Sequence, residues 1–410
     1  MSTCSSHGQP VRKQAGRLGG QRLDGQLGSI PSRRGSIRGQ LGFNLVELLM
    51  SMSMATILFM AMVVLFVRQG EVMQQQNEQI DVSREARFVL DHLRRDLTAL
   101  GSNSTPHSEI DPLVCPKPAT VLRAISLEAA TGYVQDVNLN PNVAPMALTL
   151  FGGLDVKQRF RTASVDGDTV FLEDDGKLPT TQPAFEAIFS NDRYLRLAGP
   201  DGQMMFFPIA SADLGNRSVT VVGIIPRKGG GQVCGYQSFG TGLWVDVQGF
   251  VRYRVVADSR AGAPKDPNGG AERGLLVRER MGIDGKTAGP QLILAENAVD
   301  IAIYDAAFDD DPQPDAVKLK VNPLPSDLVQ KNGDGVLGST MSSQPQTLRA
   351  LTVKVSLRAA DADRSLTHTP RAVAYSPIET WLVASDGRGA HRVFTVASRV
   401  ALPTMVSRNL

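Results

Sequence analysis

The sequence has few cysteine, histidine and aromatic residues. It contains 3 Cys and 5 His in 410 residues, and aromatic side chains make up 6%. So few cysteines exclude a disulfide-rich scaffold, and the histidines form neither an HExxH motif nor a metal-binding His/Cys spacing. Gly285-Lys286-Thr287 matches the end of a phosphate-binding loop, but Arg280 occupies the position of that motif's first glycine. The GxSxG motif of serine hydrolases does not occur. We expect neither an enzymatic activity nor a cofactor.

The charges almost cancel over the whole chain but not along it. The formal net charge is +2 at pH 7. Residues 1–42 carry seven Lys/Arg and one acid, Asp24, whereas the other 368 residues hold 36 basic and 40 acidic side chains. Nucleic-acid-binding domains concentrate basic residues on their folded surface. We therefore expect no direct nucleic-acid binding by the folded part.

Long apolar runs are absent except for one. Residues 43–67 form a stretch of 25 residues with a single charge, Glu47, and no Pro or Gly. As a helix this stretch is about 38 Å long, enough to cross a hydrocarbon core of about 30 Å. The basic residues precede it, so the positive-inside rule predicts a cytoplasmic leader and residues 68–410 across the membrane. We expect cleavage before the apolar run, whereas a secretory signal is cut after it.

Glu47 is an unusual residue for a membrane span. A carboxylate in hydrocarbon costs about 2.5–3.5 kcal/mol on insertion scales. One interpretation is that Glu47 lies one turn inside the membrane and reaches the headgroups. The other is that cleavage after Gly42 frees an α-amino cation on Phe43, which Glu47 of a neighbouring subunit neutralises.

The residues around this junction resemble a known processing signal. Gly42-Phe43-Asn44-Leu45-Val46-Glu47-Leu48-Leu49 is similar to the type III signal of type IV prepilins, pseudopilins and their relatives. In that family a prepilin peptidase cuts after the glycine and methylates the new first residue, usually Phe, and the fifth mature residue is usually Glu. The resemblance implies cleavage between Gly42 and Phe43, N-methylation of Phe43 and an assembly role for Glu47. At 42 residues, the leader is longer than those of typical members.

Residues 68–100 continue the helix in polar form. Gly70 alone interrupts a run of good helix formers, at a cost of about 1 kcal/mol. An apolar stripe at spacings of three and four comprises Ala86, Val89, Leu90, Leu93, Leu97 and Leu100. Most charged residues fall on the other faces: Arg84, Glu85, Arg87, Asp91, Arg94, Arg95 and Asp96. We predict one helix of about 55 residues that stops near Gly101, half of it in lipid and half covered by a head, with His92 structural.

Residues 101–410 are predicted to form a mainly β head. Short apolar or alternating runs predict strands at 147–151, 169–172, 194–197, 204–209, 218–225, 250–256, 275–280 and 299–304. Residues 351–357 alternate apolar and polar side chains, which indicates a half-buried strand. We predict an α+β fold in which an antiparallel sheet packs on the second half of the long helix, as in type IV pilins.

Later segments resemble the PilW family of minor pilins. They are Glu85–Leu97, then Val251–Val255, Leu276–Arg280 and Leu294–Asp300, and finally Leu348–Leu357 with Val406–Leu410. Residues 105–240 match no segment of that family. Type II secretion pseudopilins of the J type share the helix pattern but are usually much shorter, and this difference in length favours the pilus interpretation.

Two further features of the head invite a chemical interpretation. Asp305, Asp309, Asp310, Asp311 and Asp315 are close enough in sequence to suggest calcium, but they lack the alternating ligand pattern of an EF-hand, and a solvated acidic loop is the preferred interpretation. Cys115 and Cys234 both face the periplasm in the predicted topology, where a bridge would persist. We expect them to pair, the alternative being two separate thiols.

These features predict four regions: a cleaved leader (1–42), a transmembrane half-helix (43–67), a periplasmic half-helix (68–100) and a head (101–410). The resemblance implies an inner-membrane precursor that enters a type IV pilus. Its implied partners are prepilin peptidase, other minor pilins, the major pilin and a tip adhesin. The alternatives are a type II secretion pseudopilin and an uncleaved, membrane-anchored binding protein.

Overall fold

The computed structural model describes residues 44–101, 103–129, 139–141, 143, 146–229, 233–263, 265, 273–309, 319–322, 348–372, 377–383 and 389–402. The chain divides into two units, Met1–Arg68 and Gln69–Leu410. One helix, α1 (Leu45–Ala99), begins in the first unit and ends in the second. Every other described helix and strand belongs to the second unit. We call this unit the head, and it includes the end of α1 from Gln69 onward.

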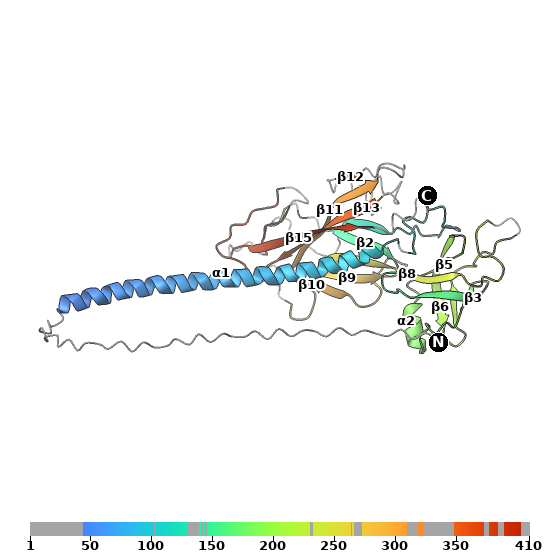
Figure 1. Cartoon of the computed structure of the whole chain (residues 1–410), viewed down its shortest axis with the longest axis horizontal. Coiled ribbons are helices and arrows are strands. Elements are labelled where there is room, and N and C mark those ends of the chain that lie inside the picture. The colour runs from blue at the N-terminus through green and yellow to red at the C-terminus, as the bar shows by residue number, and fades with distance from the viewer. Residues whose placement is uncertain are drawn as a thin grey trace, which may run out of the picture. The chain divides into compact units, whose positions relative to one another are not determined.

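Helix α1 has 55 residues, as the periodicity predicts. The helix ends in a tight last turn, in which the Leu100 amide donates to the Leu97 carbonyl oxygen at 3.1 Å. Gly101 follows with φ +75°, the left-handed conformation that commonly ends helices and favours glycine. Within the head, its residues Ala86, Val89, Leu90, Leu93 and Leu97 are buried. The apolar stripe of the sequence is therefore the face that packs on the sheets (Figure 1).

Ten strands of the described residues form an antiparallel sheet, with β8 (Trp244–Ala257) as its central strand. The first half of β8 pairs with β3 and β5, and its second half pairs with β2 and β9. The strands follow the order β1-β2-β8-β3-β4-β7-β6-β5, with β9 and β10 branching from β8. The other nine strands are β1 (Ile125–Ala129), β2 (Met146–Gly152), β3 (Arg159–Asp166), β4 (Thr169–Leu172), β5 (Tyr194–Ala198), β6 (Met204–Asp213), β7 (Ser218–Val221), β9 (Gly274–Met281) and β10 (Leu292–Ala295).

A second antiparallel sheet has five strands within the described part of the chain, in the order β12-β11-β13-β15-β14. Its strands are β11 (Ala298–Asp309), β12 (Leu319–Asn322), β13 (Leu348–Arg358), β14 (Thr380–Trp381) and β15 (His391–Ala401). One continuous core joins the end of α1 to both sheets, including residues of β2, β8, β9, β11 and β13. A separate core lies in the part of the first sheet around β3 to β7. There Phe185 of the short helix α2 (Gln182–Ile188) packs on Phe189, the residue after the helix, and Phe189 packs on Phe160.

The expected α+β organisation, a long helix with an antiparallel sheet, is present. Several strand predictions need correction. The strand at 218 stops at Val221 rather than 225, because Gly223 has φ +99° and the chain turns there. The strand at 250 begins six residues earlier, at Trp244, and the strand at 299 continues to Asp309. Strand β13 is not half-buried, since Lys354, Ser356 and Arg358 are at most 5% exposed.

Candidate functional site

The first turn of α1 presents the predicted assembly residue. Asn44 precedes the helix, and its carbonyl oxygen accepts from the Glu47 amide at 2.8 Å. Glu47 is therefore in the first turn, where a carboxylate interacts favourably with the positive end of the helix dipole. Its side chain is exposed, and no described residue forms a hydrogen bond or ion pair with its carboxylate. Gly42 and Phe43 lie outside the described residues.

The apolar half of α1 satisfies its hydroxyl groups internally. Ser51 donates to the Leu48 carbonyl oxygen at 2.9 Å, Ser53 to Met50 at 2.8 Å and Thr56 to Ser53 at 2.8 Å. In hydrocarbon, unpaired polar groups are costly, so these bonds suit a membrane span. Among the described residues, α1 is the one helix long and apolar enough to cross a membrane, and its most apolar window has a mean hydropathy of 2.3 with none of it buried. Glu47 is the one charged side chain among the described residues 44–67, and it is exposed.

A buried polar cluster fastens the end of α1 to the first sheet. The Asp96 carboxylate accepts from the Tyr253 hydroxyl on β8 at 2.5 Å and from Arg278 Nε on β9 at 2.9 Å. Arg278 also donates to Asp155 at 2.7 Å. Burial, together with the Asp96 charge, raises the pKa of the Tyr253 hydroxyl, so Tyr253 donates a proton to this bond throughout the physiological range.

This cluster corrects the prediction that Asp96 belongs to the polar faces of the helix. Asp96 is 7% exposed and faces the sheet beside the apolar stripe. Glu85 is also partly buried, and its Oε1 accepts from the Glu296 backbone amide at 2.7 Å. Burial raises the pKa of Glu85. No local pattern in the sequence indicates either contact, since Asp96 and Arg278 are 182 residues apart.

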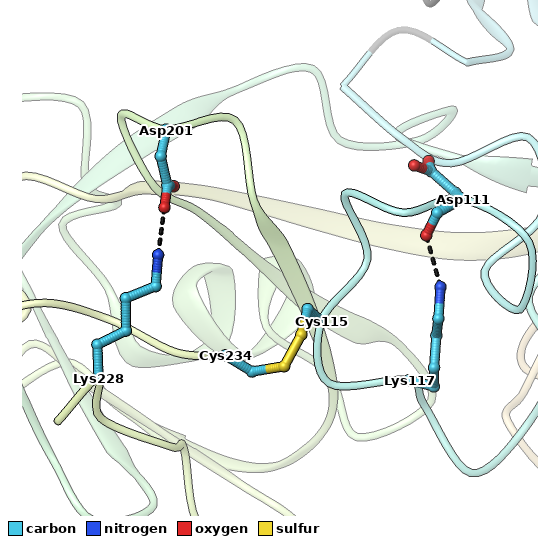
Figure 2. Close-up of a disulfide and its surroundings, with 6 residues drawn as sticks. All are labelled: Asp111, Cys115, Lys117, Asp201, Lys228 and Cys234. Atoms are coloured by element: carbon cyan, nitrogen blue, oxygen red, sulfur yellow. Dashed lines mark hydrogen bonds and ion pairs between the residues drawn. A yellow bond between two sulfur atoms is a disulfide. The ribbon is translucent and has the colours of Figure 1, made fainter. Parts of the chain in front are cut away.

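A disulfide joins Cys115 to Cys234, with their Cα atoms 5.2 Å apart. Cys115 follows a short bridge between Val114 and Met204 of β6, and its amide donates to the Met204 carbonyl oxygen at 3.0 Å. Figure 2 shows a polar contact on each side of the bond: Lys228 with Asp201, and Lys117 with the Asp111 carbonyl oxygen. The disulfide thus ties the segment after α1 to the loop that precedes β8.

The remaining chemical candidates are structural or lie outside the described residues. His92 has a ring contact with Phe88. His368 Nε2 donates to the Leu139 carbonyl oxygen at 2.9 Å, and its Nδ1 shares a hydrogen bond of 3.1 Å with Thr380 Oγ1. Within the described ranges, no group of three or more His, Cys, Asp or Glu residues is placed to hold a metal ion. The side chains of Asp305, Asp309, Asp310, Asp311 and Asp315, the acid cluster considered for calcium, are not among those described.

The sequence that imitates a phosphate loop is the turn after β9. The Gly285 amide donates to the Gly282 carbonyl oxygen at 3.0 Å, and Thr287 forms a bridge with Met281. Thr287 Oγ1 donates to Glu279 at 3.0 Å, so this hydroxyl is occupied within the fold. The turn closes on its own strand and presents no helix N-terminus to a phosphate.

Comparison with family models, curated proteins and solved structures finds no match to this chain. A functional assignment therefore depends on the residues and geometry described above.

Proposed function

We propose that this protein is a minor pilin of a type IV pilus, of the PilW kind, which acts by assembly. One observation carries the proposal: Gly42-Phe43 stands immediately before an apolar, exposed helix whose first turn holds Glu47. In the family that this junction resembles, prepilin peptidase cuts at that glycine. Until that cut, the precursor waits in the inner membrane with its head in the periplasm.

The location of the PilW-like segments supports the same proposal. They fall on the end of α1, on β8 and β9, around the β10–β11 connection and on β13, and each contributes side chains to the one core beneath the helix. The last, Val406–Leu410, lies outside the described residues. Residues 105–240, which have no counterpart in the resemblance, supply β1 to β7, and with them part of the core beneath the helix and most of the second core.

The proposed mechanism turns on the Glu47 carboxylate. After cleavage, Phe43 carries a cationic amino group, and the helix leaves lipid to pack among neighbouring helices. Pairing of that cation with Glu47 of a neighbour lowers the cost of a charge in apolar surroundings. The partners in this step are the major pilin and other minor pilins, and a tip adhesin is the further partner that the family implies.

Processing and incorporation test the proposal directly. Mass spectrometry of the mature protein is expected to find N-methylated Phe43 as its first residue, whereas an intact leader would support an uncleaved anchor. Glu47→Ala is expected to insert and to be cleaved but to be depleted from sheared pili, while Glu71→Ala, an exposed glutamate further along α1, is incorporated normally. Glu47→Ala protein at the wild-type level in pili contradicts the role of Glu47.

A deletion strain separates the pilus from the secretion alternative. Loss of a minor pilin reduces surface pili and leaves exoprotein export intact. Loss of a pseudopilin has the reverse effect, so normal piliation together with blocked export would overturn the proposal.

A further inference from the structure

A cavity of about 230 Å³ lies beside the disulfide, between the β5–β6 turn and the loop that precedes β8. The turn supplies Pro200, Asp201 and Gln203 to its wall, and the loop supplies Tyr236, Gln237 and Ser238. Pockets for drug-sized ligands begin at about 300 Å³. The cavity therefore suits a smaller ligand, of the size of one sugar ring.

The walls of this cavity are held in place from several directions. The disulfide fixes Cys234, immediately before Gly235 in the wall. Gly235 has φ +122°, and a Cβ there would lie 2.2 Å from the Pro226 carbonyl oxygen, so this close approach requires glycine. The Lys228 amide donates to the Tyr236 carbonyl oxygen at 2.7 Å, and the Lys228 side chain pairs with Asp201 across the cavity (Figure 2).

The lining is polar without a net charge. Hydrogen bonding to Lys228 holds the pKa of Asp201 below its usual value, so the Asp201 carboxylate is ionised at neutral pH and faces a residue of opposite charge. Gln237, Ser238 and Thr241 add neutral amide and hydroxyl groups at exposed positions. A phosphate or a metal ion requires an excess of one charge sign, whereas a polyhydroxylated ligand requires neutral donors and acceptors.

The inner surface adds an apolar patch and an adaptable amide. Met205 and Leu243 are buried residues of the lining, as is Tyr236. A pyranose ring has the matching character, because its hydroxyl edge bonds to polar groups while its C–H face packs on apolar ones. Gln203 Oε1 is buried without a hydrogen-bond partner among the described residues, so turning this amide toward a ligand breaks no bond at that oxygen.

We propose that this cavity is a saccharide-binding site that holds one neutral sugar residue. The site uses only residues of the head, so it does not depend on the pilus proposal. Gln237 and Ser238 bond to ligand hydroxyl groups at the mouth, and Met205 and Leu243 lie beneath the ring.

Saturation-transfer NMR on the full chain in a zwitterionic, sugar-free detergent tests the site. The probes are the methyl glycosides of glucose, galactose, mannose and N-acetylglucosamine. At least one is expected to receive saturation, with a Kd on the order of millimolar, as suits so small a ligand. Absence of transfer to all four overturns the proposal.

Variants locate the binding. Gln237→Trp fills the mouth and is expected to weaken binding at least about tenfold, and Gln237→Ala, which removes only the amide, is expected to weaken it by a smaller factor. Asn191→Trp introduces the same side chain at an exposed amide outside the lining and is expected to bind as the wild type does. Unchanged affinity in both Gln237 variants overturns the assignment to this cavity, whatever the outcome of the piliation experiments.

Discussion

At the scale of single residues, Asp96 has the clearest energetic role. Its carboxylate accepts from the Tyr253 hydroxyl and from Arg278. Asp96→Ala leaves that hydroxyl and part of the Arg278 charge buried without their acceptor. We expect the free energy of unfolding of the head to fall by about 3 kcal/mol, measured by denaturant titration in detergent.

The matched control for Asp96 is Asp91, which is exposed on the same helix. Asp91→Ala is expected to change the free energy of unfolding by no more than about 0.5 kcal/mol. If the two variants lose similar amounts, the cluster does not anchor the helix.

His391 makes the stability of the head depend on pH. Burial, and after it the Arg358 charge, lower the pKa of His391 to about 4. An unfolded histidine titrates near about 6.5, so between these values the unfolded chain binds more protons than the folded one. This group therefore makes the free energy of unfolding rise with pH by up to about 1.4 kcal/mol per pH unit from pH 4 to 6.5.

A buried acid opposes this trend, so the test of His391 is a difference between two curves. Burial, partly offset by Arg371, raises the pKa of Asp300 to about 6, which makes stability fall as the pH rises toward that value. The His391→Gln variant keeps the contribution of Asp300 to the pH dependence of stability and loses only the contribution of His391. The difference in free energy of unfolding between wild type and variant is expected to grow in favour of the wild type from pH 4 to 6.5 and then to level off. If the two curves of free energy against pH run parallel, His391 is not the group responsible.

At the scale of elements, α1 has two halves with different packing. Leu97 is fully buried against the sheets, whereas Leu65 is 60% exposed in the apolar half. Leu97→Ala is expected to lower the free energy of unfolding of the head by about 2–5 kcal/mol, since it leaves a cavity. Leu65→Ala, the same truncation on the same helix, is expected to leave that quantity unchanged in the same denaturant titration.

Local periodicity predicts α1 almost to the residue but predicts the strands less completely. The helix stripe repeats over many residues, so one face is unmistakable. Strand β13 alternates in sequence, yet its polar side chains are buried because segments distant in sequence cover them: Arg358 lies 2.9 Å from His391 Nδ1. The list of predicted strands lacks β3, in which the Arg159 and Arg161 guanidinium groups lie over the ring of Trp244 on β8.

The candidate site divides in the same way. The Gly42-Phe43 junction and Glu47 lie within a few residues of one another, so local sequence suffices to propose them. Asp96, Tyr253 and Arg278 are brought together only by the pairing of β8 with β9 beneath the helix end. The cavity beside the disulfide likewise lies between two loops that are distant in sequence and share no motif, so local sequence does not predict it.

At the scale of the whole molecule, the disulfide and the proposed cleavage after Gly42 together predict the number of free thiols. Cys4 lies within residues 1–42, and the other two cysteines are bonded to each other. We therefore expect one titratable thiol in the denatured precursor from cells that lack prepilin peptidase, and none in the mature protein. The Cys4→Ser precursor, the control, is also expected to give none.

Reduction of the same disulfide is expected to destabilise the head without altering cleavage at Gly42. The two cysteines are 119 residues apart, and the chain-entropy model gives a loop of that length about 4–5 kcal/mol of stabilisation. Denaturant titration of the mature protein with and without reductant measures this contribution, and Cys115→Ser/Cys234→Ser should match the reduced wild type. Because the leader and the bond are far apart in sequence, this double variant is still expected to be cleaved at Gly42. Two titratable thiols in the unreduced mature protein would show instead that the bond does not form in cells.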